Sequence, residues 1–419
     1  LPAGGPQSGT YAGNVTGAAT AYMQFGGNSS TTVTLTGNNS GFAGTTTLGF
    51  GSSTIGNGGT VSIGDVSNIG TGTLQFYDGV LRTTATMTLA NAVSLQTTGG
   101  GGTFNPDGGT TLTLTAGTTG GGALLKIGNG TLILDGPSAH TGGTTVSAGI
   151  LQGDAGVGIR GDIVNNAQVN ITGTTQSYTD DMSGTGSVRI IDNAIVSMDG
   201  VNTYSGSTTV EAGSELYTFS NTGLSANSAF VVDGLLGVGG GGPVTATIGS
   251  LSGTGTVISF DTLNIGALNT SSTFAGTFGS GGFFGNDSVN VNKIGTGTLT
   301  LSGAGSVLTG NLGVNAGTLS LTGTLDSATT TVASGATLYV DGTLTSPSVT
   351  IDAGGWLRGG VGTTPGNIVG AVTNSGTVAP GHSPGILAIS GSYTQTSTGT
   401  YAAEVLANGT STVAAGVDF

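Results

Sequence analysis

The sequence predicts an all-β fold in which parallel strands stack into a β-solenoid with about 20 residues per turn. One observation is a phrase that occurs twice, Gly297-Thr-Leu-Thr-Leu-Ser-Gly303 and Gly317-Thr-Leu-Ser-Leu-Thr-Gly323, with leading leucines 20 residues apart. The other is the period of two within each copy, where Leu alternates with Thr or Ser as in a strand with one buried face. A strand phrase that recurs at a fixed step of this length is typical of solenoid turns.

Apolar residues that lead such strands recur from residue 126 onward, mostly in steps of 18 to 23 residues. One step of 28 residues, from Val188 to Leu216, contains the turn-rich stretch 202–206, which we interpret as an insertion. We expect these residues to form a buried ladder. Its members are Leu132, Leu151, Val169, Val188, Leu216, Leu235, Val257, Phe278, Leu299, Leu319, Leu338, Leu357, Val378 and Tyr401.

A second phrase marks the corners between strands. Five stretches end a strand with a small residue and Gly and then lead into the next apolar phrase: 144–149, 208–213, 312–317, 330–335 and 349–354. Gly suits such corners because it adopts a positive φ without steric cost. No stretch places apolar residues at helical spacing over a dozen positions, so we expect no α-helix.

We expect one continuous solenoid with three regions. Residues 1–125 contain alternating strands at drifting spacing and are predicted to form irregular turns. Residues 126–370 are the regular repeats, and residues 371–419 are predicted to form a C-terminal cap.

Composition narrows the functional classes. The chain has 85 Gly among 419 residues, 6% charged residues, six Lys and Arg and a formal net charge of −14. Six scattered bases neither neutralise a run of phosphates nor form a polybasic patch, which argues against binding to nucleic acid or anionic lipid. The absence of cysteine excludes disulfides and thiolate metal sites. No apolar run reaches the roughly 18 residues of a spanning helix.

Two stretches closely resemble the passenger-associated repeat of bacterial autotransporters. They are residues 126–149, which begin Lys126-Ile-Gly-Asn-Gly, and residues 293–321, which begin Lys293-Ile-Gly-Thr-Gly. Residues 374–405 are similar to the segment at the C-terminal end of many such passengers. The resemblance implies a right-handed parallel β-helix in which residues 371–419 act as an autochaperone-like cap that folds first.

The resemblance also implies a location and a partner for export. Such a passenger crosses the outer membrane of a Gram-negative bacterium with the help of a translocator barrel, and is then displayed at the cell surface or released. The sequence begins at Leu1 without a Met or a signal-peptide pattern, so we expect a mature or trimmed product.

Few residues are candidates for catalysis or metal binding. Gly381-His-Ser-Pro-Gly385 has the spacing of a nucleophile elbow, but Pro384 has no N–H for an oxyanion hole, so we expect a turn there. His140 and His382 lie in turn phrases with too few neighbouring ligands for zinc. We therefore predict no catalytic residue, no metal and no cofactor.

Two groups of residues remain as candidate sites. Asp180 and Asp181 are adjacent acids, followed by Asp192 and Asp199; clustered carboxylates can hold calcium or act on a glycan, as in β-helical polysaccharide lyases and hydrolases. Lyase chemistry also needs a nearby cation, for which Arg160 and Arg189 are the candidates, and solvated loop acids are the favoured interpretation. The glycine-flanked pair Phe283 and Phe284 predicts an exposed loop tip that contacts a partner.

These observations predict a non-enzymatic, cell-surface or secreted β-helical protein with a structural or adhesive role. Its predicted partners are a surface receptor, a glycan or a second copy of the chain. Head-to-tail association into filaments or a matrix is a variant of this prediction, because strand edges at the ends of a solenoid are open to pairing. The competing prediction is a glycan-active enzyme that uses the acids from Asp180 to Asp199.

Overall fold

The structure, a computed structural model, describes residues 8–51, 58–240, 242–259, 261–279, 290–381 and 385–402. It confirms the predicted fold class: parallel strands stack about 20 residues apart in a β-solenoid of about 19 turns. The described residues contain no α-helix and one short 3-10 helix, η1 (Val66–Asn68), which is capped by the Asp65 side chain.

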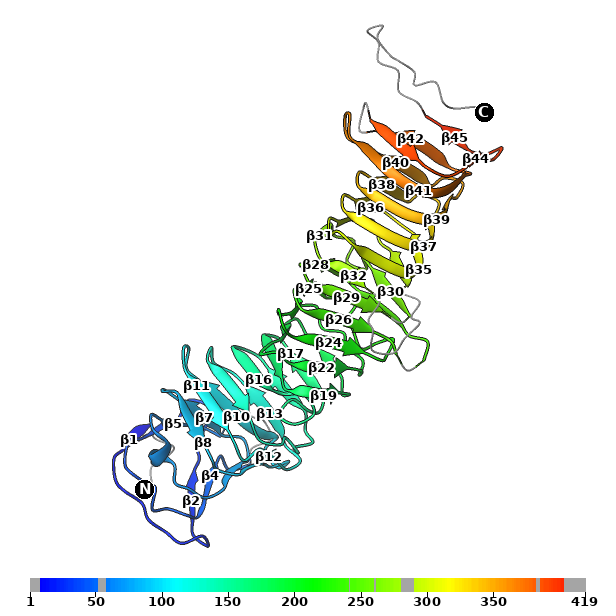
Figure 1. Cartoon of the computed structure of the whole chain (residues 1–419). Helices are drawn as coiled ribbons and strands as arrows, with labels where there is room; N and C mark the ends of the chain where they lie inside the picture. The colour runs from blue at the N-terminus through cyan, green and yellow to red at the C-terminus, as the bar shows by residue number, and fades with distance from the viewer. Residues whose placement is uncertain are drawn as a thin grey trace. The chain divides into compact units, whose positions relative to one another are not determined.

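The chain forms two compact units, Leu1–Ser228 and Ala229–Phe419. The boundaries expected near residues 125 and 370 both lie inside a unit, and their role as boundaries stays a prediction. Within each unit every turn contributes strands to two or three sheets, so neighbours within one sheet come from successive turns. Figure 1 shows this stacking for the yellow and orange strands of the second unit.

In the first unit the described strands belong to four parallel sheets. The first sheet consists of β1 (Gly9–Tyr11), β3 (Thr32–Leu35), β5 (Thr60–Ile63), β7 (Val80–Thr83), β10 (Gly101–Pro106), β13 (Ala123–Lys126), β15 (Thr144–Val146), β17 (Ile163–Asn165) and β20 (Met182–Ser183). The second consists of β2 (Tyr22–Phe25), β4 (Thr45–Leu48), β6 (Leu74–Phe76), β9 (Val93–Leu95) and β12 (Thr118–Thr119). The third consists of β8 (Met87–Leu89), β11 (Thr111–Leu114), β14 (Thr131–Leu134), β16 (Ile150–Asp154), β18 (Gln168–Thr172), β21 (Ser187–Ile190) and β23 (Thr208–Val210). The fourth consists of β19 (Thr174–Tyr178), β22 (Ile195–Met198) and β24 (Glu215–Thr218).

In the second unit two long parallel sheets alternate along the chain. One consists of β27 (Thr245–Ile248), β30 (Thr262–Ile265), β33 (Asn290–Lys293), β35 (Ser306–Val314), β37 (Thr324–Val332), β39 (Thr343–Ile351), β41 (Pro365–Asn374), β43 (Ile386–Ile389) and β44 (Tyr393–Gln395). The other consists of β31 (Ser272–Phe274), β34 (Thr298–Leu301), β36 (Thr318–Leu321), β38 (Thr337–Val340), β40 (Trp356–Gly359), β42 (Thr377–Pro380) and β45 (Thr400–Tyr401). Two shorter groups pair β25 (Ala229–Val232) with β28 (Ser250–Ser252), and β26 (Leu235–Val238) with β29 (Thr256–Ser259) and β32 (Thr277–Gly279).

The core of the first unit follows the predicted ladder only as far as Val188. The first four members pair in register: Leu132 with Leu151, Leu151 with Val169, and Val169 with Val188. Val188 then pairs with Thr208, whereas Leu216 pairs with Val196 in another sheet. The 28-residue step is therefore a change of sheet. The interpretation of residues 202–206 as an insertion is wrong, because Asn202 forms a parallel bridge with the preceding turn.

In the second unit the ladder divides in the same way. Val257 pairs with Phe278 and, on its other side, with Leu236 instead of the expected Leu235, which is only half-buried. A separate sheet contains an unbroken column, made of Leu299, Leu319, Leu338, Leu357, Val378 and Tyr401. The expected burial of Tyr401 is wrong: it pairs in register with Val378 on the last described strand but is 44% exposed. Leu132, Leu151, Leu299, Leu319, Leu338 and Leu357 are each at most 1% exposed.

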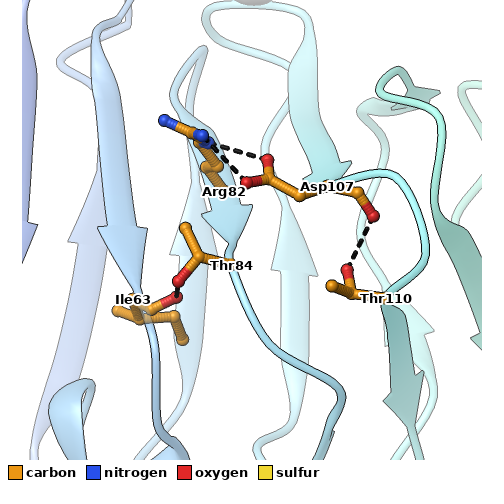
Figure 2. Close-up of polar contacts among 5 residues, drawn as sticks. All are labelled: Ile63, Arg82, Thr84, Asp107 and Thr110. Carbon is orange, nitrogen blue, oxygen red and sulfur yellow. Dashed lines mark hydrogen bonds and ion pairs between the residues drawn. The ribbon is translucent and has the colours of Figure 1, made fainter.

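Polar side chains add contacts between turns outside the core. Figure 2 shows Arg82 on β7, whose Nε and Nη2 donate to the two carboxylate oxygens of Asp107 at 2.8 Å each. The Thr84 hydroxyl donates to the carbonyl of Ile63 on the neighbouring turn at 3.3 Å, and Thr110 donates to the Asp107 carbonyl at 2.8 Å. The Arg82–Asp107 and Thr84–Ile63 contacts join adjacent turns, and the Thr110–Asp107 hydrogen bond lies within a single corner.

Two corner glycines provide a test of how tightly the turns are packed. Gly317 precedes β36 with a φ of +62°, and a Cβ there would lie 2.5 Å from the carbonyl oxygen of Gly295. Gly335 precedes β38 with a φ of +78°, and a Cβ there would meet no atom within 4 Å.

We expect Gly317→Ala to lower the free energy of unfolding by about 2 kcal/mol more than Gly335→Ala. Both variants carry the left-handed backbone penalty of about 1–2 kcal/mol, but only Gly317→Ala adds a steric clash. Urea unfolding followed by circular dichroism measures the difference. Equal losses in the two variants would show that the backbone yields to the methyl group.

Candidate functional site

Three of the four predicted acids bind backbone N–H groups of adjacent turns. Asp180 accepts from Gly161 N at 2.8 Å, Asp181 from Val201 N at 2.7 Å, and Asp199 from Phe219 N at 2.7 Å. Each partner is 19 or 20 residues away, which is one turn of the solenoid. The carboxylates thus satisfy N–H groups at corners, where the ladder of backbone hydrogen bonds is interrupted.

The fourth acid and the two predicted cations do not converge with these carboxylates into one site. Asp192 lies in an exposed turn with a φ of +60°. Arg189 forms an ion pair with Glu211, and Arg160 is exposed. In the part of the chain that the structure describes, no three His, Cys, Asp or Glu side chains gather as possible ligands of a metal ion.

The other predicted sites fall outside the described residues. These are the aromatic pair Phe283 and Phe284, and residues 382–384 of the elbow-like phrase. Two further aromatic residues, Phe274 and Phe278, are at most 1% exposed and contact each other edge to face with ring centroids 5.5 Å apart.

His140 is a buried polar group at a corner of the first unit. Its Nδ1 lies 2.8 Å from the Thr118 hydroxyl and its Nε2 lies 3.0 Å from the Thr144 hydroxyl. Tyr204 likewise stands four residues before the first Thr of a Thr-Thr-Val strand, although this strand belongs to another sheet, and its hydroxyl lies 2.7 Å from that of Thr208. Burial lowers the pKa of His140, an effect that a hydrogen bond with the Gly143 backbone partly opposes.

This burial predicts a pH dependence of stability. Because the folded-state pKa of His140 is below its unfolded value near 6.5, the unfolded chain binds the proton more readily. The stabilising contribution is therefore present above about pH 6.5 and is lost as the pH falls toward the folded-state pKa. We expect the free energy of unfolding of the wild type to drop more steeply between pH 7 and 5 than that of His140→Tyr, which introduces the Tyr204 arrangement. The free energy of unfolding is measured by chemical denaturation at each pH. If it falls equally with pH in the wild type and in His140→Tyr, His140 is not the source of the pH dependence.

Two buried lysines, which the candidate residues above do not include, form the same structure in both units. Lys126 is 0% exposed and donates from Nζ to the carbonyls of Ile127, Gly128 and Ala148 at 2.8–2.9 Å. We call this arrangement a lysine clamp, since it joins two successive turns. Burial lowers the pKa of Lys126 to about 8, so the ammonium still predominates at neutral pH.

Lys293 forms the second lysine clamp. It is 2% exposed and donates to the carbonyls of Ile294, Gly295 and Ala316 at 2.8–3.0 Å. Burial again lowers the pKa to about 8. One sequence signal marks both clamps: two of only six cations stand at the same position of the Lys-Ile-Gly-x-Gly phrase. Backbone carbonyls and corner glycines surround the Nζ atoms of both lysines, so the role of these lysines is structural.

An open cleft of about 440 Å³ lies on the outer face of the second sheet of the first unit. It is lined by side chains that alternate outward on three adjacent strands and the corners that follow them: Tyr22, Gln24, Thr45, Thr47, Phe50, Gln75 and Tyr77. The strands place Gln24, Thr47 and Gln75 in register as a row across β2, β4 and β6. Tyr22 and Phe50 are 77% and 63% exposed.

Comparison with known proteins places these features in context. A family model for the passenger-associated-transport-repeat matches residues 124–152, 195–214 and 291–321. The first and third ranges contain the lysine clamps, and the first and second contain the corners of His140 and Tyr204. No solved structure matches the chain. The described residues include no helix that is both long and apolar enough to cross a bilayer.

A stretch of 201 residues is 34% identical to the Adhesin BmaC autotransporter of Brucella suis biovar 1 (strain 1330). The match covers 44% of this chain and 6% of the relative, so the chain corresponds to a small part of that protein's length. The repeat matches fall on solenoid turns with shared corner chemistry, as expected for repeats of one kind. Together with the resemblance to the adhesin, they support an autotransporter passenger domain that contains passenger-associated transport repeats.

Proposed function

We propose that this chain is a non-enzymatic adhesive passenger, displayed on or released from the surface of a Gram-negative bacterium. The observation that carries the proposal is the 34% identity to an autotransporter adhesin over 201 residues. The export partner is an outer-membrane translocator, as in other autotransporters. The polar chemistry of the described turns supports the proposal, because Asp180, Asp181, Asp199 and both buried lysines bind backbone groups of adjacent turns.

An adhesion assay with the purified chain tests this function. Fluorescent beads coated with the chain should bind host-cell monolayers or extracellular matrix in a saturable manner, and the soluble chain should compete. Beads coated with albumin provide the background, and beads coated with heat-unfolded chain control for nonspecific stickiness. Binding no stronger than that of both controls on every surface would argue against an adhesive role.

The enzyme alternative predicts that carboxylates between Asp180 and Asp199 act on a glycan. We expect Asp180→Asn/Asp181→Asn to leave the rate on a polysaccharide panel equal to that of the wild type, at background level, because both carboxylates accept backbone hydrogen bonds. The same double variant should unfold more easily, since a neutral amide oxygen is a weaker acceptor than a carboxylate. Measurable hydrolysis or elimination by the wild type that the variant loses would establish the enzyme instead.

Self-association is a separate proposal within the adhesive function. Neighbouring strands of a solenoid pair through their backbone, so copies that meet end to end would continue the same ladder. Electron microscopy over a wide range of protein concentration tests it. Filaments that lengthen with concentration would support the proposal, whereas particles of constant size would contradict it.

A further inference from the structure

We propose that the open cleft over β2, β4 and β6 binds a neutral oligosaccharide. The inference rests on the adhesive function proposed above and names the class of ligand and the residues that would contact it. Its first support is the lining itself: at neutral pH none of the seven lining side chains carries a charge, and each is aromatic, an amide or a hydroxyl. A volume of about 440 Å³ is also within the range of ligand sites.

Phe50 is held as an exposed platform. Its backbone N–H donates to the carboxylate of Asp78 at 3.0 Å, and Asp78 is itself only 1% exposed. The ring lies over Gly26, where a Cβ would come within 1.8 Å of the ring carbon Cε2. The Gln24 amide donates to the carbonyl of Gly49, next to Phe50, at 3.2 Å. The Phe50 ring is 63% exposed, packs against Gly26 on one side and extends from a hydrogen-bonded backbone, so its open face can receive a flat apolar surface.

The row of polar groups beside this platform supplies hydrogen bonds. Gln75 lies on β6 at one end of this row, half-buried, and its amide makes no hydrogen bond to any residue that the structure describes. An amide offers a donor and an acceptor side by side, which matches the adjacent hydroxyl groups of a sugar ring. Thr45, which is half-buried, adds a hydroxyl on the neighbouring strand, whereas Thr47 is only 6% exposed and forms the floor between the two glutamines.

The exposed aromatic ring and the neighbouring polar side chains together favour one class of ligand over others. A sugar ring has an apolar C–H face for Phe50 or Tyr22 and a polar rim for Gln75, whereas an apolar side chain placed there would leave the Gln75 amide unpaired at a cost in affinity. An anionic glycan would find no cation among the lining residues that the structure describes, and it would approach a chain with a formal net charge of −14. The lining therefore fits uncharged hexose and N-acetylhexosamine oligomers.

A binding assay with the intact chain tests the inference. The immobilised protein is titrated with neutral oligomers of glucose, galactose, mannose and N-acetylglucosamine, and with sialylated and sulfated oligosaccharides. We expect at least one neutral oligomer to bind, and Phe50→Ala and Gln75→Ala each to weaken that binding about tenfold. Gly26→Ala should weaken it as well by displacing the Phe50 ring. Phe219→Ala is the matched control, because Phe219 is 47% exposed and does not line the cleft.

Circular dichroism and thermal unfolding of each variant verify that the fold is retained. The inference is overturned if no neutral oligomer binds, if Phe50→Ala and Gln75→Ala bind as the wild type does, or if charged oligosaccharides alone bind. The adhesion assay separates this failure from failure of the proposed function. If beads coated with Phe50→Ala adhere as well as beads coated with the wild type, the adhesive function is retained but does not depend on this cleft.

Discussion

Leu319→Asp is expected to unfold several adjacent turns of the second unit and to lower its free energy of unfolding by more than about 5 kcal/mol. Leu319 is 1% exposed and lies between Leu299 and Leu338 in an unbroken column. The substitution removes about 1.5–3 kcal/mol of apolar burial and places a carboxylate without a partner among leucines. Because a solenoid turn buries its core only against its neighbours, the damage should spread along the stack.

Ser320→Asp is the matched control for this substitution. Ser320 is the next residue of β36, its side chain points to the opposite face, and it is half-buried at the surface. The control adds the same charge and should change the free energy of unfolding by less than about 1 kcal/mol. Native-state hydrogen exchange distinguishes the two outcomes. Loss of protection confined to β36 in Leu319→Asp would contradict the cooperative stacking of turns.

Lys126→Met is expected to lower the free energy of unfolding of the first unit by about 3 kcal/mol or more. Methionine fills a similar volume but donates no hydrogen bonds, so three carbonyls from the corners of two successive turns lose their donor. Each unpaired buried carbonyl costs about 1–3 kcal/mol, and removal of a buried charge offsets part of this sum. The space beside Nζ is closed, since a Cβ on Gly149 would lie 2.7 Å from it, which limits entry of a replacing water.

Arg160→Met removes the same charge from an exposed side chain of the same unit and should be nearly neutral. Urea denaturation of the two variants and the wild type gives the difference directly. The clamp of the second unit provides an internal repeat of the experiment, because Lys293→Met should behave as Lys126→Met does. If Lys126→Met were as stable as Arg160→Met, water or a movement of the backbone would have replaced the hydrogen bonds of the lysine.

The sequence predicted the regular parts of the fold because local pattern and tertiary contact coincide there. Leu299, Leu319, Leu338 and Leu357 stand 19 or 20 residues apart and pair in register on neighbouring strands. The prediction lost accuracy where the chain moves between sheets. The alternation of apolar and polar residues indicates which face of a strand is buried, but it does not indicate which sheet the strand joins. The predicted alignment of Leu216 with Val188 in one column is therefore wrong.

The candidate site was harder to predict than the fold. The closeness in sequence of the acids from Asp180 to Asp199 suggests a cluster, but three of them accept hydrogen bonds from backbone groups one turn away. The lysine clamps carried a signal, a cation repeated within the same phrase, whose meaning depends on carbonyls from the following turn. Gln24, Thr47 and Gln75 carry no common motif, because steps of 23 and 28 residues separate them in the least regular region.

The sequence by itself therefore determined the class of fold, the length of a turn and the glycine corners. These features depend on contacts between chemically similar residues that recur at nearly the same spacing, so their pattern is visible along the chain. Only the tertiary structure decided which sheet each strand joins, which charges are buried against carbonyls, and which outward side chains meet in one cleft. Those outcomes depend on register between turns, which is fixed by packing and corner geometry and is not written in any single stretch.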